Sequence, residues 1–194
     1  MNGKKKVITA VCIGIAVMTG LICISCNKIP GWVTWEKRQI KDATGEYEVT
    51  LSSRAVSVSR SSDQKIIWKS QKGVKVQDVL SCDIDGDGND ELILLCWKSG
   101  RFGKYRPFWI EQDEKEWSQH IFVYKYTENQ ITPMWMSSYI GQDVVKINAK
   151  PDFRQKYYLI LTDRNGENSN WAWNYWGSVS YTHLRAHETE LHLV

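Results

Sequence analysis

The sequence predicts an all-β protein, and three observations lead to this fold class. Residues 46–51 and 55–59 alternate apolar and polar side chains with a period of two, which is typical of half-buried strands. Residues 92–97 form a short apolar run bounded by turn residues, as a buried strand does. Helical i, i+3, i+4 periodicity is absent over any window longer than about ten residues. The main body of the chain is therefore expected to consist of strands and turns.

The remaining elements can be placed in chain order. A short strand is expected at residues 65–68, before an acidic loop and the apolar run. Residues 98–118 are polar and rich in turn residues, so we expect a long surface loop there. His120 begins a strand-like run, in which it is expected to be a structural side chain. A further apolar strand is predicted at residues 157–162.

The acidic loop is the motif that carries chemistry. Asp83, Asp85 and Asp87 alternate with other residues, and Gly86 and Gly88 allow the backbone to turn tightly. Carboxylates this close repel one another unless a cation lies among them, and a ligand set made only of oxygen favours Ca²⁺. An acidic surface turn without metal is the alternative. An EF-hand is excluded, because its twelfth position falls on Leu94 and a strand follows instead of a helix.

The loop resembles a known calcium-binding repeat. Residues 83–92 match the pattern D-x-D-G-D-G-x-x-[D/E]-L of FG-GAP/VCBS-type β-propeller repeats at every defined position. The resemblance implies an array of antiparallel propeller blades. It also implies a calcium ion held by a backbone carbonyl of Asn89 and by the side-chain oxygens of Asp83, Asp85, Asp87 and Glu91.

A degenerate internal repeat supports an array. Residues 56–70 and 122–137 both read as strand, turn, strand and end in Trp-x-Ser, with Trp68 and Trp135 in matching positions. A spacing near 67 residues exceeds a propeller blade of roughly 40–50 residues, so each unit would carry an insertion. Residues 149–154, in the place of the acidic loop, lack the metal pattern. We therefore expect an incomplete β-propeller-like array with one calcium ion.

The N-terminus predicts export. Three Lys precede residues 7–25, which are apolar and uncharged, as in a signal peptide or membrane anchor. Ser25 before Cys26 half-resembles a bacterial lipobox, so Cys26 is the candidate lipidation site; Cys23 departs from that pattern. Residues 1–25 are thus assigned to a signal peptide or anchor. Both alternatives predict an extracytoplasmic, membrane-anchored protein.

The C-terminus differs in character from the rest. Residues 179–189 resemble a translated sequencing-adapter fragment, and three of the four histidines lie in the last twelve residues. We expect residues 178–194 to be an artefactual tail after a propeller-like domain at 26–177 that is truncated. The predicted consequence is an unpaired strand edge near residues 171–176, with the tail unpacked.

Cysteine and tryptophan positions give further expectations. Cys82 and Cys96 are expected to be buried free thiols, because a hairpin closed by the acidic loop separates them by roughly 13 Å. Trp68, Trp97 and Trp135 lie at strand ends and are expected to pack in the core or between blades. Trp171 and Trp173 share one face of a strand. They form either an exposed platform for sugar rings or part of a packed strand.

Composition restricts the classes of function. The formal net charge is +3, but residues 1–25 hold three Lys and no acid, so the rest is neutral. No basic stripe remains that would indicate nucleic-acid binding.

Three classes of function remain open. The preferred one is a non-catalytic, calcium-stabilised module that binds protein or glycan at the cell surface. The others are a carbohydrate-active enzyme using loop carboxylates and a structural subunit of an envelope complex. Glu111, Asp113 and Glu116 are the candidate carboxylates for the enzyme, and the sequence does not name the ligand.

Overall fold

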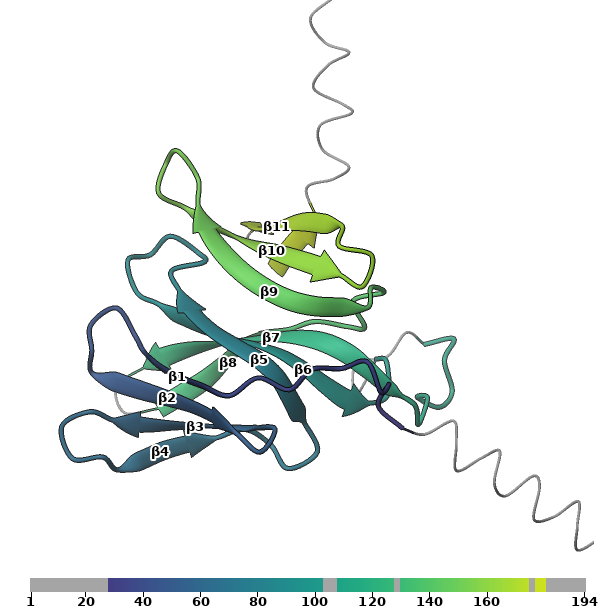
Figure 1. Ribbon diagram of the computed structural model, residues 1–194, viewed down its shortest axis with the longest axis horizontal. Helices are drawn as coiled ribbons and strands as arrows, with labels where there is room; N and C mark the ends of the chain where they lie inside the picture. The colour runs from purple at the N-terminus through teal and green to yellow at the C-terminus, as the bar shows by residue number, and fades with distance from the viewer. Residues whose placement is uncertain (1–27, 103–107, 128–129, 175–176, 181–194) are drawn as a thin grey trace, which may run out of the picture.

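The computed structural model describes residues 28–102, 108–127, 130–174 and 177–180, and these residues form three four-stranded antiparallel sheets (Figure 1). All regular elements in this part of the chain are strands, so the predicted all-β class is confirmed. In the same part, no helix has the length and apolar character needed to cross a membrane. Residues 1–25, Cys26 and residues 181–194 lie outside the described residues.

The first sheet has the strand order β1-β2-β3-β4. Two of its strands are the alternating segments of the sequence, and their inward residues are buried because every second side chain points to the same face. The strands are β1 (Arg38–Lys41), β2 (Tyr47–Ser52), β3 (Ala55–Arg60) and β4 (Ile66–Lys69).

The second sheet has the order β5-β6-β7-β8 and lies between the other two (Figure 1). Burial on both faces explains the continuous apolar run of its second strand. Leu92, Leu94 and Cys96 pack toward the first sheet, whereas Ile93 and Leu95 pack toward the third. The strands are β5 (Lys75–Cys82), β6 (Glu91–Ser99), β7 (Trp117–Thr127) and β8 (Gln130–Met136).

The third sheet has the order β12-β11-β10-β9. Its strands are β9 (Val144–Pro151), β10 (Tyr157–Asp163), β11 (Asn168–Asn174) and β12 (Gly177–Ser180). The unpaired edge expected near residues 171–176 is wrong over Trp171–Asn174, because β12 pairs there with β11. Main-chain pairing needs few specific side chains, so a Gly-Ser-Val-Ser segment can cover the edge.

Neighbouring sheets contact each other through their first strands and through repeated tryptophans. β1 contacts β5, and β5 contacts β9. Trp68 on β4 packs edge-on against Tyr124 of the second sheet, with ring centroids 4.8 Å apart. Trp135 on β8 packs edge-on against Trp173 of the third sheet, at 6.3 Å. The predicted repeat therefore marks equivalent positions, and Trp173 belongs to a packed strand.

A buried polar network joins the second and third sheets. The Gln119 amide donates to the Val144 carbonyl (2.7 Å) and to Gln77 Oε1 (2.8 Å), and the Val144 N–H donates to Gln119 Oε1 (2.9 Å). Trp97 Nε1 also donates to Gln77 Oε1, at 2.9 Å. Because buried polar groups require partners, this network fixes how β9 lies against the second sheet.

The two cysteines of the described chain are buried and free, as predicted. Cys82 lies opposite Glu91 and Cys96 lies opposite Val76, so the two thiols are far apart along the β5–β6 pair. Burial raises the pKa of Cys82 to about 12, which keeps its thiol protonated at neutral pH.

Candidate metal centre

The acidic loop connects β5 to β6 and is built as a tight, glycine-dependent turn. Gly86 and Gly88 have φ angles of 78° and 91°, in the left-handed region that favours glycine. The carboxylate of Asp83 stabilises the turn by accepting hydrogen bonds from backbone N–H groups later in the loop. Its Oδ1 accepts hydrogen bonds from the N–H groups of Gly86 (2.7 Å) and Asp87 (3.0 Å), and its Oδ2 accepts one from Gly88 (2.9 Å). Backbone conformation therefore fixes this carboxylate without help from a metal.

Glu91 is the buried member of the site. It is the first residue of β6, and its side chain is fully buried. Oε2 accepts a hydrogen bond from the Ile84 N–H at 3.0 Å, whereas Oε1 has no hydrogen-bond partner among the described residues. Burial, and next the nearby charge of Asp85, raise the pKa of Glu91 to about 7. A buried carboxylate oxygen without a donor is costly and indicates a missing partner.

Three carboxylates converge at this point. One oxygen from each of Asp83, Asp85 and Glu91 lies within 4.8 Å of the other two. The first two side chains are half-buried, so the group is open on one side and closed by Glu91 on the other. This acidic triad can hold a metal ion.

Lys125 is the charged neighbour that the sequence reading did not identify. It lies on β7 directly opposite Glu91. Its ammonium nitrogen is 2.8 Å from Asp85 Oδ2, 2.6 Å from Asp87 Oδ2 and 4.0 Å from Glu91 Oε1. The hydrogen bond from Lys125 lowers the pKa of Asp87. A cationic group of the chain itself therefore offsets part of the negative charge.

The loop is also held by neighbouring sheets. Asp90 Oδ2 accepts hydrogen bonds from the Ala43 N–H (2.9 Å), in the β1–β2 turn, and from the Ser81 hydroxyl (3.0 Å). On the other side, the Lys156 side chain from the β9–β10 turn lies next to Gly86. The acidic loop thus lies between turns of the first and third sheets. Lys125 and Ala43 are distant in sequence, so only the strand pairing could have revealed their contacts with the loop.

The chemistry of these groups fits the calcium ion that the sequence predicts. Every candidate ligand atom in the triad is a carboxylate oxygen, which a hard cation prefers to nitrogen or sulfur ligands. Glu91 Oε1 lacks a donor and would gain one strong partner. The residues present therefore fit a divalent cation, with Asp83, Asp85 and Glu91 supplying negative charge.

Of the remaining predicted ligands, Asp87 takes other partners in the described structure, while the hydrogen bonds of Asn89 involve its nitrogens and leave its predicted ligand, the backbone carbonyl, untested. Asp87 Oδ1 accepts hydrogen bonds from the backbone N–H (2.9 Å) and side-chain amide (3.1 Å) of Asn89, while Oδ2 contacts Lys125. Asp87 and Asn89 therefore remain predicted ligands whose side chains are not part of the triad. The candidate lipidation residue Cys26 lies outside the described residues.

The alternative residues for catalysis have structural contacts. Asp113 Oδ1 accepts hydrogen bonds from the N–H groups of Arg101 (2.9 Å), Phe102 (3.2 Å) and Glu114 (3.0 Å), so it organises the β6–β7 connection. His120 is fully buried; its Nδ1 is 3.0 Å from the Ser137 carbonyl oxygen, to which it donates. This geometry agrees with the structural role predicted for His120.

Comparison with known proteins leaves the site as the main source of functional evidence. No protein-family model, curated protein or solved structure matches this chain.

Proposed function

We propose that this chain is a non-catalytic, calcium-stabilised module of the β-propeller type, held outside the cytoplasm by an N-terminal membrane anchor, and that it binds a protein or a glycan. The observation that carries the proposal is Glu91: its buried Oε1 has no hydrogen-bond partner in the described structure, and its carboxylate lies together with those of Asp83 and Asp85. A divalent cation gives this oxygen a partner and offsets the repulsion among the three groups.

The arrangement of sheets supports the propeller part of the proposal. Each sheet is a four-stranded antiparallel unit of strands consecutive in sequence, and the first strands of successive sheets contact each other. Propeller blades have this organisation, with the first strand innermost. The loop motif of FG-GAP/VCBS-type repeats, found at the β5–β6 connection, supports the same interpretation.

The choice of calcium follows from the ligands and from the proposed location. Carboxylate and carbonyl oxygens suit Ca²⁺, which accepts variable coordination geometry, whereas Mg²⁺ requires near-ideal octahedral geometry and retains its water. Extracellular modules bind calcium with dissociation constants of roughly 10⁻⁴–10⁻³ M, which external calcium is sufficient to fill.

Calorimetric titration of the full chain with Ca²⁺ and Mg²⁺ tests the metal site. We expect saturable Ca²⁺ binding that Asp85→Asn weakens by about tenfold or more, since one anionic ligand is lost. Glu167→Gln removes one negative charge from an exposed residue in the β10–β11 turn, at the end of β10 opposite the turn that lies next to the acidic loop, and serves as the matched control. Equal binding by both variants would place the ion elsewhere, and absence of binding would remove calcium from the proposal.

Cell fractionation tests the location. The unmodified chain should be found in the membrane fraction and be accessible to external protease after removal of any outer barrier. Cys26→Ser should release it if lipidation is the anchor and leave it in the membrane if residues 7–25 form an uncleaved span. Recovery of the unmodified chain as a soluble cytoplasmic protein would contradict the proposed location.

A further inference from the structure

A hollow on the first sheet gathers positive charge. Its volume is about 500 Å³, within the range typical of small-ligand sites. The β2–β3 turn and the β4–β5 connection form its walls. Four cationic residues line it and no Asp or Glu does; the cations are Arg54, Lys69, Lys72 and Lys75.

In the part of the chain that the structure describes, these four cations have no counter-ion. Within the described residues, none of them forms an ion pair with a carboxylate, although other basic residues of the same chain, including Arg38 and Arg60, do so. Like charges on one small surface repel, and an anion that binds among them relieves this repulsion. The hollow therefore has the electrostatics of an anion site.

The position of Arg54 is fixed by unusual backbone geometry. Ser53 and Arg54 have φ angles of 52° and 64°, so both central positions of this two-residue turn are left-handed. Such turns favour Asn-Gly, and two residues with larger side chains are disfavoured there. The Arg54 carbonyl accepts a hydrogen bond from the Val76 N–H at 2.9 Å, and its guanidinium lies 4.3 Å from the centre of the Trp35 ring. The contact with Trp35, which does not itself line the hollow, restricts the guanidinium to a position beside the β2–β3 turn.

The wall of the hollow formed by the β4–β5 connection is held in place by hydrogen bonds to β3. The Val56 N–H donates to the Ser70 hydroxyl at 3.0 Å, and the Ser70 N–H donates to the Val56 carbonyl at 2.9 Å. These bonds hold the β4–β5 connection against β3. Five lining residues carry hydroxyl groups, and these residues are Thr50, Ser52, Ser53, Ser57 and Ser70.

We propose that this hollow binds an anionic saccharide, one bearing sulfate or carboxylate groups. The cations match the acidic groups, and the hydroxyls can both donate to and accept from the hydroxyls of a sugar. An acidic protein segment offers charge but few matching hydroxyls, and a stable protein interface usually buries about 800 Å² per partner instead of one small hollow. The inference specifies the ligand of the proposed surface-binding function and rests on it for the choice of an extracellular saccharide.

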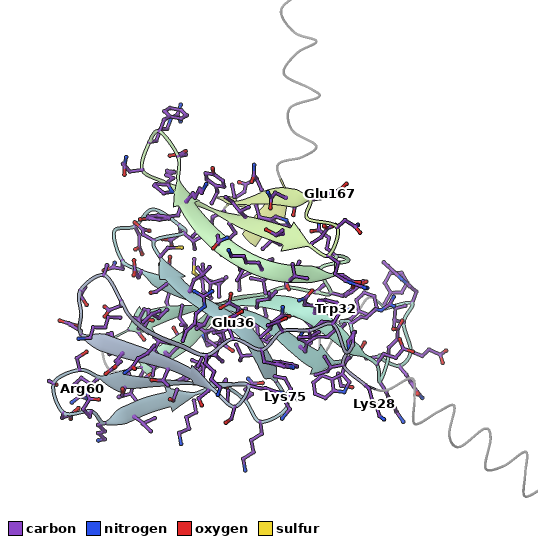
Figure 2. All side chains as sticks on the ribbon, viewed as in Figure 1. Lys28, Trp32, Glu36, Arg60, Lys75 and Glu167 are labelled. Carbon is purple, nitrogen blue, oxygen red and sulfur yellow. The ribbon has the colours of Figure 1, made fainter. Side chains whose placement is uncertain are left out.

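The site is separate from the metal centre. In an antiparallel sheet of consecutive strands, the β2–β3 turn and the β4–β5 connection lie at the end opposite the β1–β2 turn, and it is the β1–β2 turn that contacts the acidic loop. Figure 2 shows Lys75 at the lower edge of the molecule, at the start of β5, whereas the acidic loop follows the other end of the same strand, after Cys82. Saccharide binding and calcium binding can therefore be measured independently.

The test is calorimetric titration of the full chain with a sulfated disaccharide, a uronic-acid disaccharide and a neutral disaccharide. We expect at least one acidic sugar to bind and the neutral sugar not to bind. Arg54→Gln combined with Lys72→Gln should weaken binding by about tenfold or more, since two charge-assisted contacts are lost. Lys65→Gln combined with Lys146→Gln changes the net charge equally at exposed positions outside the hollow and should leave binding unchanged.

Three results would overturn the assignment: no binding of either acidic sugar, equal weakening by both double variants, or equally tight binding of a poly-glutamate peptide that depends on Arg54 and Lys72. The last result would assign the hollow to an acidic protein segment. A chain that binds the acidic sugar but shows no calcium response would retain this inference and lose the calcium part of the proposed function.

Discussion

The ammonium group of Lys125 lies 2.8 Å from a carboxylate oxygen of Asp85, on the open side of the acidic triad. The pairing of β6 with β7 places Lys125 opposite Glu91, so the lysine is part of the sheet that supports the site. A metal ion in the loop must share these carboxylates with Lys125 or displace its side chain. The lysine therefore acts both as a counter-ion without metal and as a competitor for it.

Replacing Lys125 by Met should separate these two effects. Calcium affinity should rise by about tenfold or more, because a competing positive charge near the ligands is removed. Without calcium, the same variant should lose about 1 kcal/mol of stability, because two carboxylates lose their counter-ion. Calcium titration and chelator-treated chemical unfolding measure the two quantities. Lys146→Met is the control, and unchanged calcium affinity in Lys125→Met would show that the lysine does not compete.

Glu91→Gln should have the opposite effects, a lower calcium affinity and a higher stability without calcium. The amide oxygen can still accept the Ile84 N–H, while the buried negative charge disappears. At pH 8 and without calcium, the variant should be more stable than the unmodified chain by about 1–2 kcal/mol. Added calcium should shift its unfolding midpoint little. If Glu91→Gln is instead less stable than the unmodified chain in chelator, the negative charge of Glu91 stabilises the fold without metal. That result would contradict the interpretation that its buried oxygen lacks a metal partner.

Sequence patterns located the strands with clear apolar alternation but gave no signal for β1 and β9, and β5 was expected only as the strand that leads into the acidic loop. Gln77 and Asp78 of β5 are buried polar residues, and β9 carries Lys146 and Asn148. Such polar residues disrupt the alternating pattern, and Gln77 is satisfied only by residues distant in sequence. The repeat was visible from Trp68 and Trp135, because equivalent inter-sheet contacts select the same residue type.

The acidic loop could be predicted because its ligands lie within nine consecutive residues. The structure adds that Glu91, at the end of the motif, is the buried member with an unpartnered oxygen. Lys125 contacts the loop carboxylates only because β7 pairs with β6 across a long insertion. The sequence around Lys125 contains no signal for this contact. Three of the four cations of the hollow lie close together in sequence at and beside the β4–β5 connection, and Arg54 of the β2–β3 turn meets them only in the folded sheet.

The polar network between the second and third sheets predicts a large effect of Gln119→Leu. The substitution removes the acceptor of the Val144 N–H and a donor to Gln77, all in a buried environment. We expect a loss of about 2–4 kcal/mol in the free energy of unfolding, from the unsatisfied polar groups. Gln130→Leu, at an exposed position on β8, is the matched control for denaturant unfolding. A loss below that of the control would show that the network does not join the sheets.

His120 should contribute a loss of stability on acidification, and Glu91, whose pKa is raised to about 7, should contribute in the opposite direction over the same pH range. Burial lowers the pKa of this imidazole below its usual value of 6.5, so the unfolded chain binds a proton that the folded chain excludes. The contribution is complete above about pH 6.5 and is lost as the pH falls toward the folded-state pKa, with a slope of at most about 1.4 kcal/mol per pH unit. Unfolding free energies at pH 7.5 and 5.5 measure it. Between pH 7.5 and 5.5, the stability of His120→Gln should fall less, or rise more, than that of the unmodified chain, and an equal change in both chains would show that His120 does not contribute.

The most direct test of the account is thermal unfolding of the full chain in mild detergent with Ca²⁺, Mg²⁺ or chelator. Calcium at a hundredfold excess over its dissociation constant should stabilise the fold by about 2.7 kcal/mol and raise the midpoint by about 5–10 °C. Mg²⁺ should raise it much less, and Asp85→Ala should largely lose the calcium response. A midpoint indifferent to both calcium and chelator would leave the loop as an acidic turn neutralised by Lys125 and contradict the proposed calcium-stabilised module.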